Sequence, residues 1–98
     1  MIVIVWRFVA KAERVREFES RYSGEGDWAQ LFARAEGYIG TEMWRAVDEA
    51  NTYLVLDRWD SAEHFSAFKA KFQREYEALD RMCEALTERE EKVGVFAA

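Results

Sequence analysis

A chain of 98 residues is long enough for one domain with a modest core. Half of the residues are hydrophobic and 15% are aromatic, which excludes a disordered chain. The formal net charge is −5 and no basic stripe is visible, so we expect no nucleic-acid partner. The heavy aromatic content indicates a self-association surface, an apolar pocket, or both.

Cysteine content and hydropathy narrow the class of protein further. The single cysteine, Cys83, cannot form an intramolecular disulfide or a thiolate metal cluster, and we expect no metal site. The chain opens directly into a strand pattern, without the basic segment or cleavage site of a signal peptide. No apolar run approaches the ~20 residues that span a membrane. We therefore expect a cytoplasmic protein with no membrane partner.

The first part of the chain predicts a strand followed by helices. Ile2–Ala10 is rich in β-branched and aromatic residues and predicts a strand, with Trp6 among the apolar residues of one face. Lys11–Tyr22 has apolar residues at spacings of three and four, which predicts an amphipathic helix. After a break rich in serine and glycine, Asp27 can cap a short second helix that ends at Gly37.

Two strands joined as a hairpin are predicted next. They are Tyr38–Val47 and Thr52–Trp59, and the four residues between them form a polar connection of the length found in hairpins. Alternation in the later strand places Tyr53, Val55, Asp57 and Trp59 on one face and Leu54 and Leu56 on the other. The faces of the earlier strand are ambiguous: Glu42 lies with Tyr38 and Trp44, while Thr41 and Arg45 lie with Ile39 and Met43.

The end of the chain predicts one long helix and a last strand. Asp60–Glu63 fits a helix start, with an acidic cap and a glutamate three residues later. Apolar residues from Phe65 to Leu86 then recur at threes and fours, which predicts about six turns of helix. Glu91–Ala97 predicts a short closing strand.

The order βαββαβ predicts an α+β, ferredoxin-like fold: a four-stranded antiparallel sheet with helices on one face, in a single domain over residues 1–98. The other face would expose Leu54 and Leu56 to water unless a partner covers it. We therefore expect a homodimer in which two sheets pack face to face about a two-fold axis.

Three segments carry a family resemblance: MIVIVWRFVAK at the start, then EGYIGTEMWR, then YLVLDRWDSAEHF followed by a long helix. The chain resembles the antibiotic biosynthesis monooxygenase (ABM) family of the dimeric α+β barrel superfamily. The resemblance implies a ligand pocket between sheet and helices in each protomer. Some relatives use it to oxidise polycyclic phenolic substrates with molecular oxygen, without metal or flavin. The deprotonated substrate itself passes an electron to oxygen.

Another branch of the resembled superfamily binds and degrades haem. It uses an asparagine in the first strand, a tryptophan at the end of the third and a histidine on the long helix. Trp59 matches the tryptophan, but the first strand has no asparagine and His64 lies before the expected position near Lys69. The resemblance therefore implies no cofactor. The oxygenase branch tends to have an asparagine at the position of Asp57 or Val55, so its residue set is incomplete here.

Asp57 and His64 are the candidate catalytic residues. A carboxylate on the helix-covered face is costly unless it is paired or faces a pocket, and burial raises the pKa of Asp57 towards that of a base. The alternative is an acid paired with a lysine or arginine. His64 could shuttle protons, because its pKa lies near neutrality; alternatively, it is an ordinary residue of the first helical turn.

Large aromatic side chains are the candidate walls of the pocket, although aromatics on strands also serve as core. The substrate-binding candidates are Trp6, Trp44, Tyr53, Trp59 and Phe65. Three functions stay open: a cofactor-independent monooxygenase for a small aromatic or quinol-like metabolite, a non-catalytic binder of such a molecule, and a structural dimer. An enclosed cavity beside Asp57 favours either of the first two.

Overall fold

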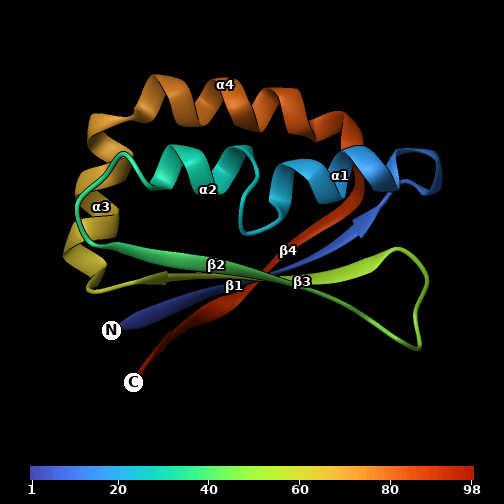
Figure 1. Cartoon of the computed structure of the whole chain (residues 1–98), viewed down its shortest axis with the longest axis horizontal. Helices are drawn as coiled ribbons and strands as arrows, with labels where there is room; N and C mark the ends of the chain where they lie inside the picture. Colours follow the sequence, from blue (N-terminus) through green and yellow to red (C-terminus); the bar gives the residue numbers. More distant parts are fainter.

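The computed structural model describes every residue from Met1 to Ala98. The elements in chain order are β1 (Ile2–Ala10), η1 (Ala12–Arg14), α1 (Val15–Tyr22), α2 (Asp27–Phe32), β2 (Tyr38–Arg45), β3 (Thr52–Trp59), α3 (Ala62–Lys71), α4 (Gln73–Cys83), η2 (Glu84–Leu86) and β4 (Thr87–Ala97). The strands form one antiparallel sheet in the order β2-β3-β1-β4, and all helices lie on one of its faces (Figure 1). The predicted ferredoxin-like α+β fold is confirmed. No helix is long and apolar enough to cross a membrane.

Two predictions about the second half of the chain were wrong. The long helix is broken at Phe72, whose φ of −109° and ψ of 27° end α3 before α4 begins. The two helices therefore run in different directions (Figure 1). The last strand begins at Thr87 and not at Glu91, because its acidic first half pairs with the central strand β1 through Val9–Arg89 and Phe8–Glu90. This pairing overrides the poor strand propensity of the charged residues.

A bulge decides which residues of β2 face the helices. Tyr38 pairs with Trp59, but the register then shifts, so that Thr41 pairs with Asp57. Tyr38 and Thr41 are three positions apart, so strict alternation would put them on opposite faces. Their side chains nevertheless both face the helices, because the bulge adds one residue to this strand. Trp44 pairs with Leu54 and lies on the opposite, open face.

The core lies between the sheet and the helices and is dominated by aromatic rings. It includes Ile4, Phe8, Phe18, Tyr22, Trp28, Phe32, Tyr53, Val55, Trp59, Phe68 and Phe72. The assigned faces of β3 are confirmed: Tyr53, Asp57 and Trp59 are buried, while Leu54 is exposed and Leu56 half-buried. No helix covers the second face of the sheet, where Trp44, Leu54 and Phe96 are exposed (Figure 1).

Candidate functional site

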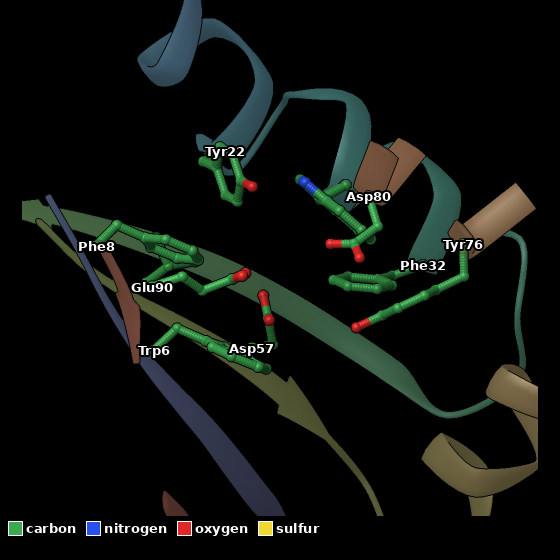
Figure 2. Close-up of a pocket in the computed structure, with 10 residues that line it drawn as sticks. Trp6, Phe8, Tyr22, Phe32, Asp57, Tyr76, Asp80 and Glu90 are labelled. Carbon is green, nitrogen blue, oxygen red and sulfur yellow. The ribbon is translucent and has the colours of Figure 1, made fainter. Parts of the chain in front are cut away.

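A small cavity of about 40 Å³ lies between the sheet and helices α1, α2 and α4 (Figure 2). It has room for only a few water molecules in this form. Aromatic rings and carboxyl groups make up most of its wall. The lining residues are Trp6, Phe8, Tyr22, Trp28, Phe32, Val55, Asp57, Tyr76, Asp80 and Glu90.

Asp57 is the buried carboxyl group of this cavity. It lies on the helix-facing side of β3 and is only 6% exposed. The Thr41 hydroxyl donates a hydrogen bond of 2.8 Å to Asp57 Oδ1, and the Tyr38 hydroxyl lies 2.6 Å from Thr41 Oγ1. No basic side chain pairs with Asp57, so the alternative of a paired acid is wrong. Burial raises the pKa of Asp57 to about 6, although the hydrogen bond from Thr41 opposes the rise.

Two more acids and a phenol form the part of the wall that faces Asp57. Tyr76 and Asp80 come from α4, one helical turn apart, and Glu90 comes from the inner face of β4 (Figure 2). Burial raises the pKa of Tyr76 to about 12, and the charges of Asp80 and Glu90 add to the rise. Burial, then the charge of Asp80, also raises the pKa of Glu90. This cavity therefore disfavours negative charge.

The structure brings only two of the seven candidate residues, Trp6 and Asp57, to the cavity wall. Trp59 is fully buried behind Phe32, with ring centroids 5.7 Å apart, and its indole N–H has no hydrogen-bond partner. Phe65 packs against Trp59 at 5.4 Å, one layer further from the cavity.

The other two aromatic candidates lie elsewhere. Tyr53 is a core residue whose hydroxyl donates a 2.6 Å hydrogen bond to Glu19 on α1. Trp44 is 61% exposed on the open face of the sheet, because the β2 bulge turns it away from the helices. The structure therefore places Trp44 outside the cavity.

His64 also lies outside the cavity, in a surface hollow between α3 and the segment before β2. Its Nδ1 lies 2.6 Å from Asp60 Oδ1, and this contact raises the pKa of His64 above the ordinary value. The backbone N–H of His64 donates to the Ser61 hydroxyl, which caps α3. His64 is thus part of the helix start and does not face Asp57.

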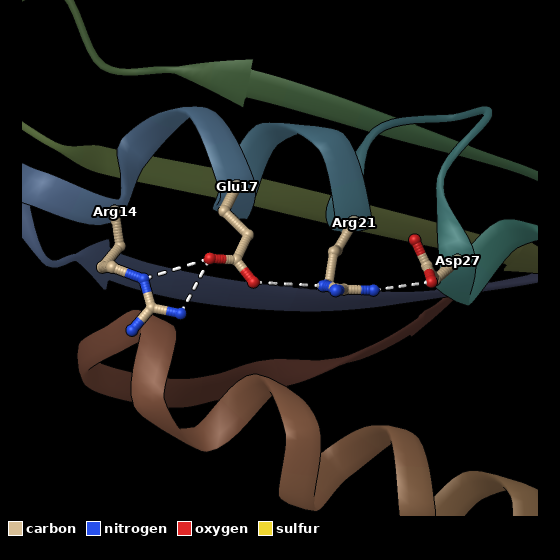
Figure 3. A network of polar contacts seen from close by, with 4 residues as sticks. All are labelled: Arg14, Glu17, Arg21 and Asp27. Atoms are coloured by element: carbon tan, nitrogen blue, oxygen red, sulfur yellow. Dashed lines mark hydrogen bonds and ion pairs between the residues drawn. The ribbon is translucent and has the colours of Figure 1, made fainter.

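Ion pairs connect two of the helices that cover the cavity, α1 and α2. Glu17 accepts hydrogen bonds from Arg14 and lies 3.6 Å from Arg21 Nε, and Arg21 donates a 2.8 Å hydrogen bond to Asp27 (Figure 3). Asp27 is the first residue of α2, which supplies Trp28 and Phe32 to the wall. The network therefore ties α1 to the start of α2.

No group of three or more histidine, cysteine, aspartate or glutamate side chains is placed to hold a metal ion. Cys83 is buried on α4, and burial raises the pKa of its thiol. The arrangement offers instead one buried carboxyl group with a raised pKa, a chain of two hydroxyl groups bonded to it, and aromatic walls. An ionised carboxylate with a raised pKa can accept a proton from a hydroxyl group beside it.

Comparison with known proteins identifies the family and agrees with the fold. The family model described as "Antibiotic biosynthesis monooxygenase" matches residues 1–74. SnoaB from Streptomyces nogalater, a cofactor-independent oxygenase, is 28% identical, with a TM-score of 0.74 over 99% of this chain and 91% of that one. A NIPSNAP domain protein from Burkholderia xenovorans (17% identity, TM-score 0.73, covering 100% of this chain and 94% of that one) shares the fold. No curated protein matches the chain.

Proposed function

Because the chain belongs to the antibiotic biosynthesis monooxygenase family, we propose that it is a cofactor-independent oxygenase for a small aromatic, quinol-type molecule. The observation that carries the proposal is a buried, unpaired carboxyl group, Asp57, in a cavity walled by aromatic rings. The likeness to SnoaB supports the same reaction class.

Asp57 acts as the general base in this proposal. Its ionised carboxylate accepts the proton of a substrate hydroxyl, and the raised pKa makes it a stronger base than an ordinary aspartate. The resulting phenolate gives one electron to dioxygen, and the two radicals combine at a substrate carbon to form a peroxide. Loss of water from the peroxide leaves a quinone-type carbonyl, so one dioxygen yields one product oxygen and one water. The aromatic walls hold the ring flat and exclude water.

The cavity must widen to hold such a substrate, since it is smaller than a single aromatic ring with substituents requires. Trp6 and Tyr76 are the half-buried rings of the wall, and the remaining aromatic lining residues are buried. We propose that these two rings move to admit the substrate.

Oxygen uptake with a panel of substituted hydroquinones tests the function. Isotopically labelled dioxygen distinguishes an oxygenase, which places the label in the product, from an oxidase, which does not. Asp57→Asn keeps the shape of the side chain but removes the base, and we expect a loss of 10²-fold or more in turnover. Asp48→Asn, in the exposed β2–β3 connection, is the matched control and keeps full activity.

His64 gives a second discriminating variant. Because His64 lies outside the cavity, we expect His64→Ala to retain turnover. If Asp57→Asn and His64→Ala both leave turnover unchanged, neither residue is the base and the catalytic assignment fails.

Binding without turnover is the second candidate function, and the acidic wall favours it. The surroundings that raise the pKa of Tyr76 also oppose ionisation of a substrate phenol. A panel member that binds but consumes no oxygen would support this alternative.

We also propose that two chains associate through the open face of the sheet. Trp44, Leu54 and Phe96 are 61%, 41% and 50% exposed there, which is unusual for large apolar side chains on one face of a small domain. Sizing by light scattering at micromolar concentration tests the dimer, and a monomer would overturn it. Leu54→Lys should weaken association, because it puts a charge in the centre of this face.

A further inference from the structure

The cavity wall combines aromatic faces with acids and contains no base. Six of its ten residues are aromatic and three are carboxylic acids, and none is lysine, arginine or histidine. Asp57, Asp80 and Glu90 take part in no ion pair. The acids reach from the interior to the surface, because Asp57 is buried, Asp80 is half-buried and Glu90 is exposed.

Polar groups inside the cavity lack partners, which points to a ligand. The indole N–H of Trp28, a wall residue that is only 7% exposed, has no hydrogen-bond partner. One carboxyl oxygen of Asp57 accepts from Thr41, and the other has no partner. Buried polar groups nearly always have partners, so these two atoms are available to a bound molecule.

The electrostatics of the wall define the charge of that molecule. Aromatic faces carry a negative quadrupole and attract cations, and the three carboxyl groups add negative charge at the same place. Burial, and after it the charge of Asp80, raises the pKa of both Tyr76 and Glu90, so a further negative charge is unfavourable there. A positive charge beside Asp80 and Glu90 would relieve this repulsion.

We propose that the cavity binds an aromatic molecule that carries one positive charge, as a protonated or quaternary amine, with its cationic group between Asp80 and Glu90 and its hydroxyl group at Asp57. This inference deepens the proposed function, since it names the substrate class of the same site. It also removes the conflict with phenolate formation: a fixed positive charge on the substrate offsets the phenolate that Asp57 helps to create.

Three phenols of similar size test the charge preference directly. They are 3-hydroxyphenyltrimethylammonium, its neutral isostere 3-tert-butylphenol, and the anion 3-hydroxybenzoate. Calorimetric titration without oxygen measures binding alone. We expect the ammonium compound to bind at least about tenfold more tightly than the isostere at low salt, and the benzoate to bind most weakly. Added salt reduces the preference, because Glu90 is exposed.

Charge-neutralising variants locate the preference. Asp80→Asn and Glu90→Gln should each lower the ratio of ammonium to neutral affinity several-fold, mainly through weaker binding of the ammonium compound. Glu77→Gln removes a charge from an exposed position of the same helix and should preserve the ratio.

Equal or tighter binding of the neutral isostere would overturn the inference, and so would a preference that survives in the Asp80→Asn/Glu90→Gln double variant. Failure of all three probes to bind would overturn it as well. These outcomes are separate from the oxygenase proposal. Neutral hydroquinones that are turned over without any cation preference would leave that proposal standing and refute this one.

Discussion

Asp57→Asn should stabilise the protein at neutral pH while it removes the proposed base. The pKa of Asp57 is about 6 in the folded protein, against an ordinary value of 3.8. Because the folded state binds this proton more tightly, ionisation of Asp57 costs stability. Below pH 3.8 both states hold the proton and the cost is absent. The cost grows as the pH rises to about 6 and is complete above that value.

The size of the effect follows from the same two values. A difference of about two pKa units corresponds to about 3 kcal/mol of unfolding free energy. Asparagine keeps the acceptor for the Thr41 hydroxyl but carries no charge. Asp57→Asn should therefore match the parent protein near pH 3.5 and exceed it by about 3 kcal/mol at pH 7.5.

Urea unfolding followed by tryptophan fluorescence, at several pH values and one fixed protein concentration, measures this difference. The fixed concentration matters because association would add to the apparent stability. Asp48→Asn again serves as the control and should show no pH-dependent gain. A stability difference that stays constant between acid and neutral pH would refute the reasoning, because Asp57 would then not titrate with a raised pKa.

Three further variants have defined outcomes. Thr41→Val removes the hydrogen bond to the Asp57 carboxylate, so the pKa of Asp57 should rise by roughly one to two, and the pH at half-maximal turnover should rise with it. Tyr53→Phe loses the hydrogen bond to Glu19, and urea unfolding should show a loss of about 1–3 kcal/mol without a change in ligand affinity. Gly37→Ala should lower the melting temperature, because Gly37 has a φ of +91° and an added Cβ would lie 2.6 Å from side-chain atoms of Asp60 and His64. An unchanged melting temperature would contradict this.

Much of the fold could be predicted because the strands alternate cleanly. In β3 the alternation alone placed Tyr53, Asp57 and Trp59 under the helices, and burial agrees. In β2 the alternation left the faces ambiguous, and a bulge, which has no signature in the side-chain pattern, reverses the faces on one side of it. Trp44 was a pocket candidate as a large aromatic residue, yet it lies on the open face.

The cavity could be predicted only in part. Trp6 and Asp57 follow from strand faces, but Asp80 depends on the direction of α4, which the break at Phe72 sets. Glu90 lies in a charged segment that has no apolar pattern, and only its pairing with Phe8 makes it part of a strand. The spacing of Tyr76 and Asp80, four residues apart, was the one available sign that both share a helix face.

The acids of the cavity are explained by function better than by stability. A buried, unpaired Asp57 costs about 3 kcal/mol at neutral pH, and an asparagine of the same shape would avoid that cost. Asp80 and Glu90 add repulsion at the same place without forming any ion pair. None of the three charges forms an ion pair that would stabilise the fold, whereas a bound cation would interact favourably with all of them. The same charges that oppose an empty, ionised site would thus favour a positively charged phenol and its deprotonation at Asp57.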